Sequence, residues 1–150
     1  MRALIQRVNH ASVEVSGEII SSIQLGLLVL IGVSENDLRA DAEYLASKIS
    51  GLRIFSDEHG KMNLSIRDIK GELLIVSQFT LHAYTKKGNR PSFIGAAKPD
   101  IAQELYHHFV HLIKESTQLK VCTGRFGAMM NISLENAGPV TILIDSADPE

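Results

Sequence analysis

The chain has almost no cysteine, no long apolar run and no segment typical of an exported protein. Its single cysteine, Cys122, has no partner for an internal disulfide, which agrees with a reducing compartment. A small buried apolar role suits Cys122 better than a nucleophilic one, so we assign it no chemistry. No apolar run approaches the roughly 20 residues of a membrane-spanning helix, and Met1–Arg7 lacks the apolar core of a secretory signal. These absences predict a cytoplasmic protein.

The chain also lacks an excess of positive charge. Its net charge is −2 and its isoelectric point is near 6.3, so no broad basic field favours nucleic acid. Any contact with RNA must therefore be local. The one concentrated basic stretch is Lys86-Lys87-Gly88-Asn89-Arg90, with Lys98 and Arg125 as possible additions. This stretch is either a solvated loop or a local RNA contact, and it lies in a long polar segment, residues 82–98, that we expect to form a lid.

No internal repeat, heptad series or metal motif is present. Three histidines, His107, His108 and His111, have spacings that can share a helix face and in principle bind a metal. No His-Glu-x-x-His arrangement or cysteine pair completes such a site. We therefore expect neither a metal nor another cofactor.

The pattern of apolar residues predicts an α+β fold in one domain, residues 1–150, with a mostly antiparallel or barrel-like sheet and two main helices. Expected strands include 4–8, 11–15, 18–23, 27–33 and 72–81, and a last strand pair is expected over 127–134 and 140–145. The unbroken apolar character of Leu27–Val33 indicates burial on both faces. Two helices are expected, one capped by Asn36 or Asp37 and one starting at Asp100. The order of strands and helices does not indicate the regular strand–helix alternation of a parallel sheet.

Two short motifs suggest a functional site. In Asn136-Ala137-Gly138-Pro139-Val140-Thr141, a Gly-Pro step opens the expected final strand. Proline cannot donate a ladder hydrogen bond and glycine has no side chain, so two backbone carbonyls can be presented to a ligand that approaches closely. An ordinary turn is the alternative. The second motif, Ser77-Gln78-Phe79-Thr80-Leu81, ends a buried apolar run.

Thr80 is a candidate nucleophile, but it needs a base. His82 would share a strand face with Thr80, at roughly 7 Å along the backbone, and the two side chains need not align. The alternative, which we favour, is that Ser77 and Thr80 line a pocket while Gln78 and backbone amides donate to a developing oxyanion. Arg7 reads by itself as an exposed cation. Phe79, Phe93, Met129 and Met130 read as core, although an aromatic side chain beside a pocket could stack on adenine.

Together these motifs give the chain its resemblance to the D-aminoacyl-tRNA deacylase family. Further matching blocks are Ile5–Val8, Arg53–Asp57, Gly60–Leu64, Arg90–Phe93 and Thr123–Phe126, so the resemblance covers essentially the whole chain. It implies a homodimer that hydrolyses the ester between a D-amino acid and the 3′-terminal adenosine of tRNA. It also implies a cis Gly138–Pro139 bond that reaches into the partner's pocket and is steadied by Arg7, with the ribose 2′-hydroxyl assisting water.

On this basis we assign catalysis to Ser77, Gln78, Phe79 and Thr80, and substrate binding to Arg7, Phe93, Met129, Met130, Ala137, Gly138 and Pro139. Two parallel carbonyls can hold an α-ammonium so that only one enantiomer turns its side chain into the backbone. Chirality would then be read by exclusion, and glycyl-tRNA would also be a substrate. Two other classes stay open: a non-catalytic RNA- or DNA-binding module that uses residues 86–90, and a small-molecule esterase with Thr80 as nucleophile.

Overall fold

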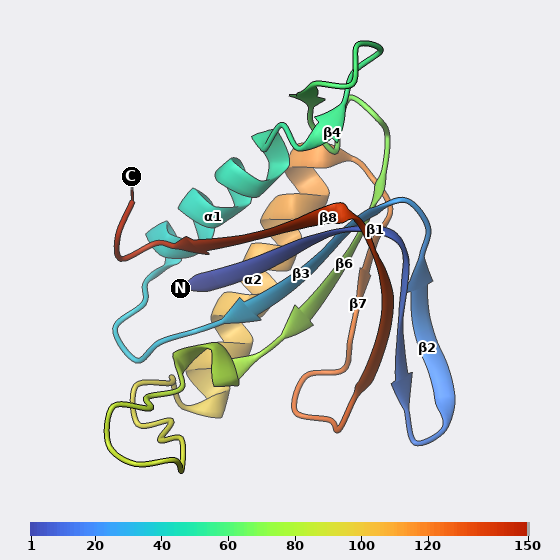
Figure 1. Cartoon of the computed structure of the whole chain (residues 1–150). Helices are drawn as coiled ribbons and strands as arrows, with labels where there is room; N and C mark the ends of the chain where they lie inside the picture. Colours follow the sequence, from blue (N-terminus) through green and yellow to red (C-terminus); the bar gives the residue numbers. More distant parts are fainter. Residues whose placement is uncertain (150) are drawn as a thin grey trace.

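The computed structural model describes residues 1–149 and is organised around one long strand, β1 (Arg2–Val15) (Figure 1). After a tight turn, β2 (Glu18–Ile23) and β3 (Gly26–Gly32) run back along one side of β1. The last strand, β8 (Asn131–Asp145), pairs with the other side of β1 along almost its whole length. The two strands expected over 4–8 and 11–15 are therefore one continuous strand.

The rest of the main sheet is parallel. Strand β6 (Glu72–Ser77) pairs with β3, and β7 (Val121–Thr123) pairs with β6, each in parallel orientation. Parallel neighbours need a crossover connection, which α1 (Arg39–Gly51) and α2 (Pro99–Thr117) supply. The sheet curls so that its ends meet, since Ser21 Oγ of β2 donates a 2.8 Å hydrogen bond to the Thr123 carbonyl of β7. The result is a nearly closed barrel.

Alternate residues of the central strands pack into two separate cores. On β3 and β6, Leu27, Val29, Leu73 and Ile75 face the helices, whereas Leu28, Leu74 and Val76 face the inside of the curled sheet. A strand between two apolar layers needs no polar alternation. This arrangement confirms the prediction that Leu27–Val33 is buried on both faces.

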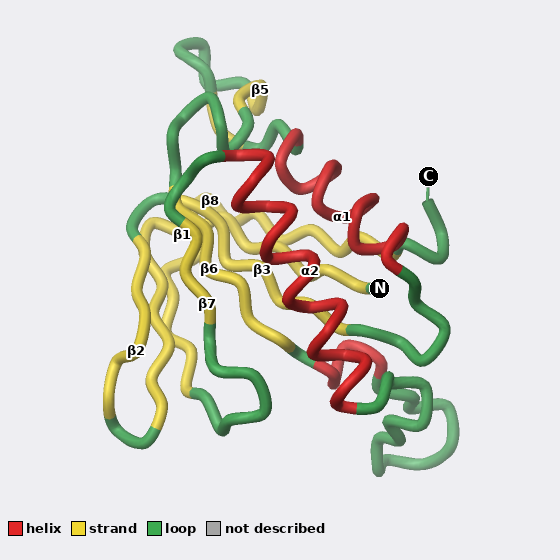
Figure 2. Tube along the Cα trace, turned by 180° about the vertical axis from the view of Figure 1, so that it is seen from behind, coloured by secondary structure: helices red, strands yellow, loops and turns green. Residues whose placement is uncertain are grey.

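Both helices cover the same face of the sheet (Figure 2). The buried stripe of α2 consists of Ala102, Leu105, Tyr106, Phe109, Val110 and Ile113. Proline at the first turn suits the start of α2, because that position has no intrahelical acceptor for its amide. Asp41 accepts a 2.8 Å hydrogen bond from the Leu38 amide and so satisfies a free donor at the start of α1. A separate small hairpin, β4 (Phe55–Ser56) and β5 (Met62–Leu64), follows α1.

The α+β fold class with a barrel-like sheet and two main helices is confirmed. Besides the single strand found in place of 4–8 and 11–15, three details of the expectation were wrong. The strand–helix alternation that the sequence argued against is present, because α1 and α2 connect the parallel neighbours β3, β6 and β7. The regions expected as a last strand pair, 127–134 and 140–145, contribute instead to one strand, β8, whose partner is β1. The strand expected to reach Leu81 ends at Ser77 and is followed by η1 (Phe79–His82), a turn of 3-10 helix.

Among residues 1–149, neither α1 nor α2 is long and apolar enough to cross a membrane.

Candidate active site

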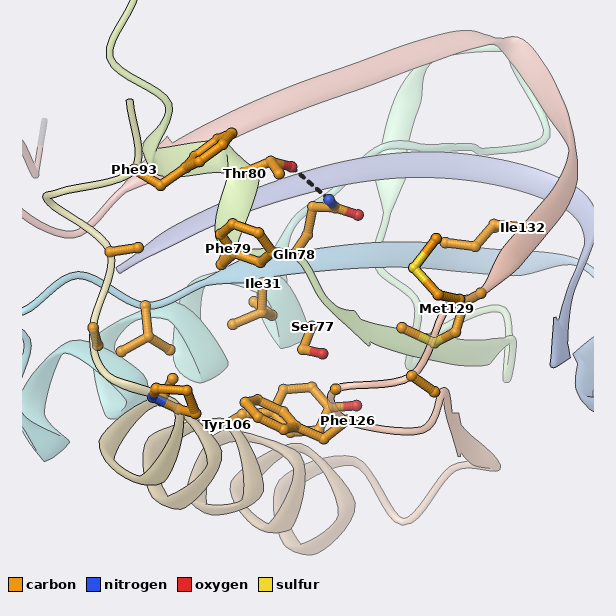
Figure 3. A pocket seen from close by; sticks show the side chains of 18 residues that line it. Ile31, Ser77, Gln78, Phe79, Thr80, Phe93, Tyr106, Phe126, Met129 and Ile132 are labelled. Carbon is orange, nitrogen blue, oxygen red and sulfur yellow. Dashed lines mark hydrogen bonds between the residues drawn. The ribbon is translucent and has the colours of Figure 1, made fainter. Parts of the chain in front are cut away.

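A cavity of about 710 Å³ lies where β6 ends, between η1 and the first half of α2 (Figure 3). Its volume suits a ligand the size of a nucleoside. Three groups of residues line it. The first is Ser77–Thr80, at the end of β6 and the start of η1. The second is Phe93, Ala96 and Ala97 before α2, with Pro99, Ala102 and Tyr106 on α2, and the third is Phe126–Met130 before β8, with Ile132 on β8. Ile31 and Val33 complete the wall. None of these side chains is charged.

The end of β6 presents free backbone amides beside the cavity. The Gln78 amide still donates to the Ile31 carbonyl at 2.7 Å, which is the last such bond between β3 and this segment. The chain then turns into η1, and the first amides of a helix have no partner within the helix. Within residues 1–149, neither the Phe79 amide nor the Thr80 amide donates a hydrogen bond. Both are therefore available to a ligand.

Thr80 is paired with Gln78 and not with a base. Gln78 Nε2 donates to Thr80 Oγ1 at 2.5 Å (Figure 3). His82 makes no hydrogen bond to Thr80, and its Nε2 is buried without a partner among the described residues. The Thr-His pair considered from the sequence is thus not assembled, because the 3-10 turn removes the strand geometry on which it depended.

Aromatic side chains form opposite walls of the cavity. Phe79 and Phe93 meet edge to face, with ring centroids 5.1 Å apart, and Phe79 is 56% exposed. Across the cavity, Tyr106 lies against Phe126 at 5.9 Å, and its hydroxyl donates to the Ile75 carbonyl at 2.8 Å. Burial raises the pKa of Tyr106, so this hydroxyl stays protonated at neutral pH. Sequence reasoning missed Tyr106, because at its helical spacing it reads only as core.

The Gly-Pro step forms a bulge in the pairing of β1 with β8. Gln6 pairs with Thr141 and Val8 pairs with Asn136, so four residues of β8, 137–140, lie opposite Arg7 alone. Such a bulge pushes backbone out of the sheet and frees it from the ladder. Gly138 and Pro139 are both exposed. Their main chain is therefore accessible to another molecule.

The Arg7 guanidinium contacts the backbone of this bulge. Its Nε donates to the Ala137 carbonyl at 3.0 Å, and its Nη1 donates to the Ile54 carbonyl at 2.5 Å. Gly138 has a φ of +99°, and a Cβ built there would collide with the Arg7 guanidinium. Arg7 is thus a half-buried donor and not the freely exposed cation that its position alone suggested.

Gln6 forms hydrogen bonds with the two residues that flank the bulge, a contact that the motifs did not predict. The Thr141 hydroxyl lies 2.5 Å from Gln6 Oε1, and Asn136 Nδ2 donates to the same oxygen at 3.0 Å. Gln6 therefore ties together the two ends of the bulge, Asn136 and Thr141. The alternation of β1 could have indicated Gln6, since it lies next to Arg7 on the strand, but nothing in the sequence paired it with β8.

One expected feature of the bulge is absent. The resemblance implied a cis Gly138–Pro139 bond, whereas no peptide bond among residues 1–149 is cis. The trans isomer is the lower-energy form of an X-Pro bond by about 0.5–1 kcal/mol.

The structure divides the expected site residues into two groups. Ser77, Gln78, Phe79, Thr80, Phe93, Met129 and Met130 all line the cavity. Arg7, Ala137, Gly138 and Pro139 lie elsewhere, and of these Arg7 and Ala137 line a separate shallow hollow beside Phe55. Within a single chain, the bulge therefore does not reach the cavity. Among the described residues, no group of three His, Cys, Asp or Glu side chains is placed to hold a metal ion.

Comparison with known proteins matches this chain to one family. The family model described as D-Tyr-tRNA(Tyr) deacylase matches residues 4–145. A protein of Thermosipho melanesiensis named D-aminoacyl-tRNA deacylase is 57% identical over 97% of both chains, and one of Flavobacterium psychrophilum with the same name is 53% identical over the whole of both.

Solved structures show the same fold. One described as a c-Myc DNA unwinding element binding protein superposes with a TM-score of 0.92 at 40% identity, over all of both chains. Another, described as a probable eukaryotic D-amino acid tRNA deacylase, has a TM-score of 0.82 over 95% of this chain, and at 18% identity it shows the fold alone. The matching motifs, the fold and the close relatives together establish that this chain belongs to the D-aminoacyl-tRNA deacylase family.

Proposed function

We propose that this protein hydrolyses the ester of D-aminoacyl-tRNA and releases free tRNA and a D-amino acid. The observation that carries the proposal is the uncharged, nucleoside-sized cavity with two free amides at its edge, in a chain of the deacylase family. Incubating the purified protein with D-tyrosyl-tRNA and L-tyrosyl-tRNA, and following loss of each ester, tests it directly. Rapid loss of the D-ester alone is expected, and equal stability of both esters would refute the proposal.

The chemistry suggested by this site is carried by backbone groups. Water attacks the ester carbonyl, and the bond from that carbon to the ribose oxygen breaks. The amides of Phe79 and Thr80 can donate to the oxyanion that develops, and one such donor is worth about 2.7–4 kcal/mol of barrier in hydrolases. The ribose 2′-hydroxyl of the substrate assists the water. The flat, apolar walls formed by Phe79 and Phe93 suit the terminal adenine.

Selection for D-amino acids is assigned to the Gly138–Pro139 bulge. Its backbone can exclude an L-side chain while its carbonyls hold the α-ammonium. Because the bulge does not reach the cavity of its own chain, this role requires a second copy, whose cavity receives it. The outer edge of β8 supports such an arrangement: among residues 1–149, β8 pairs only with β1, and Leu143 on it is 59% exposed.

A homodimer is therefore expected in solution. Light scattering coupled to size separation should give twice the chain mass of 16.5 kDa at micromolar concentration. A fully active protein with the mass of one chain would contradict the cross-subunit role of the bulge.

Thr80→Ala is expected to keep substantial activity. Thr80 Oγ1 contacts Gln78 and has no base beside it, so its removal deletes a pocket contact and not a nucleophile. Single-turnover rates on D-tyrosyl-tRNA measure the effect. Removal of a nucleophile costs on the order of 10⁴-fold or more in hydrolytic triads, and a loss of that size in a folded variant would restore the covalent mechanism.

A further inference from the structure

Between η1 and α2 the chain forms an exposed basic hairpin, which we define as Tyr84–Ser92. Its two ends are tied by a pair of backbone bonds, from the Tyr84 amide to the Ser92 carbonyl at 2.7 Å and from the Ser92 amide to the Tyr84 carbonyl at 3.0 Å. Its tip exposes Lys86, Lys87 and Arg90. The hairpin is thus a defined projection that presents cations to solvent.

The basic hairpin is attached to the rim of the cavity at both ends. Thr80, four residues before it, and Phe93, the residue after it, both line the cavity. Figure 1 shows the hairpin at the same end of the molecule as η1 and the first turn of α2. A ligand that fills the cavity and extends outward therefore leaves it beside the hairpin.

Charge is distributed very unevenly along the chain. From Leu73 to Pro99 there is no Asp or Glu, whereas Lys86, Lys87, Arg90 and Lys98 give this segment a charge of +4. Since the whole chain has a net charge of −2, the rest carries −6. None of the four cations forms an ion pair with a carboxylate of residues 1–149, and the nearest acidic residue in sequence is Asp100, at the start of α2.

An exposed aromatic side chain accompanies these cations. Tyr84 is 53% exposed, and Lys86 Nζ lies 5.7 Å from the centroid of its ring. Surfaces that bind single-stranded nucleic acid combine a cationic track along the backbone with aromatic rings on which bases stack. The basic hairpin contains both elements.

We propose that the basic hairpin binds the phosphates of the acceptor end of tRNA while the terminal adenosine occupies the cavity. The cavity offers no charged side chain, so the phosphates of the preceding nucleotides must find their cations at the rim. The hairpin supplies them within a protein that is otherwise negative and would repel RNA. This inference rests on the proposed function, and it adds the surface that recognises the polynucleotide rather than the amino acid.

The test compares two substrates that share the ester but not the phosphates. The variant is K86Q/K87Q/R90Q, and the substrates are D-tyrosyl-tRNA and D-tyrosyl-adenosine. We expect kcat/KM on D-tyrosyl-tRNA to fall at least tenfold, while kcat/KM on D-tyrosyl-adenosine stays within about twofold. In a plot of log binding constant against log salt concentration, the slope for uncharged tRNA should become shallower by about 2–3, because each phosphate contact contributes about 0.7–0.9.

A matched control removes the same charge from the other end of the molecule. K48Q/K61Q/K114Q changes three lysines near the end of α1, in the β4–β5 hairpin and near the end of α2, none of which lines the cavity. This control should leave tRNA binding and its salt slope unchanged. An equal loss in the control and in the hairpin variant would show a general charge effect and overturn the proposal.

Other outcomes separate this proposal from the proposed function. If the hairpin variant loses activity equally on both substrates, the hairpin acts on the cavity and not on phosphates, and the proposal fails. If the wild-type protein hydrolyses neither ester, the proposed function fails, and the salt-dependent binding of uncharged tRNA still decides whether the hairpin contacts RNA. Competition by duplex DNA of equal length as strong as that by tRNA would overturn recognition of an acceptor end.

Discussion

Glycyl-tRNA and D-alanyl-tRNA are expected to be hydrolysed at comparable rates, whereas L-alanyl-tRNA should survive. If the backbone of Gly138 and Pro139 rejects L-amino acids only by collision, then an amino acid with two hydrogens on Cα has nothing to collide. A soft hydrophobic pocket resolves one methylene by about 1–3 kcal/mol, or up to roughly 200-fold. The main chain of the bulge is held by Arg7 and deforms less than the side chains of a hydrophobic pocket. The ratio of the D-alanyl-tRNA rate to the L-alanyl-tRNA rate should therefore exceed this limit.

The measurement is deacylation of the three aminoacyl-tRNAs side by side under single-turnover conditions, with the same tRNA body in each. Using one tRNA removes any difference due to contacts with the nucleic acid. Glycyl-tRNA that resists hydrolysis while D-alanyl-tRNA is cleaved would mean that the site recognises a D-side chain by direct contact. The exclusion mechanism would then have to be abandoned.

Gly138→Ala is expected to lower kcat/KM on D-alanyl-tRNA by about 10²-fold or more. A Cβ at this position collides with the Arg7 guanidinium, so the bulge or Arg7 must shift. A misplacement of about 1 Å at a positioning element can cost on the order of 10²-fold in rate. The φ of +99° also disfavours any residue other than glycine, so some loss of folding stability accompanies the loss of activity.

Gly60→Ala is the matched control for that loss of stability. Gly60, in the β4–β5 hairpin, has a φ of +75°, but a Cβ there meets nothing within 4 Å. Both substitutions introduce backbone strain, so thermal unfolding should report a decrease in stability for each, and the decrease should be larger for Gly138→Ala because of the added collision with Arg7. Only Gly138→Ala should change the deacylation rate. Wild-type rates in a folded Gly138→Ala protein would show that the bulge tolerates displacement and does not position the substrate.

The two groups of site residues explain why the proposed homodimer matters to both predictions. In one chain, the cavity holds the amides that can stabilise an oxyanion, and the bulge holds the main chain that can exclude a side chain. Neither group alone accounts for hydrolysis that is selective for one enantiomer. Substitution at Gly138 therefore tests the assembly as well as the residue, since its effect would be exerted in the partner's cavity.

The local pattern of the sequence determined the elements whose evidence lies within a few residues. The unbroken apolar run at Leu27–Val33 predicted a strand between two apolar layers, and the segment after Asp100 predicted a helix, which is α2. The two motifs also identified which segments would be unusual. Gly138-Pro139 interrupts the ladder, as the missing amide of proline implies, and the Ser77–Thr80 segment borders the cavity.

Only the tertiary structure decided which segments pair and where the site forms. Periodicity tells which face of a strand is buried but not which strand lies beside it, so the pairing of β8 with β1 and the parallel pairs of β6 could not be inferred. The same limit hid Gln6, whose partners Asn136 and Thr141 lie 130 and 135 residues away, and it left Tyr106 to read as ordinary core. Contacts between distant segments are set by packing of the whole chain, and that packing brings the free amides, the aromatic walls and the basic hairpin to one end of the molecule.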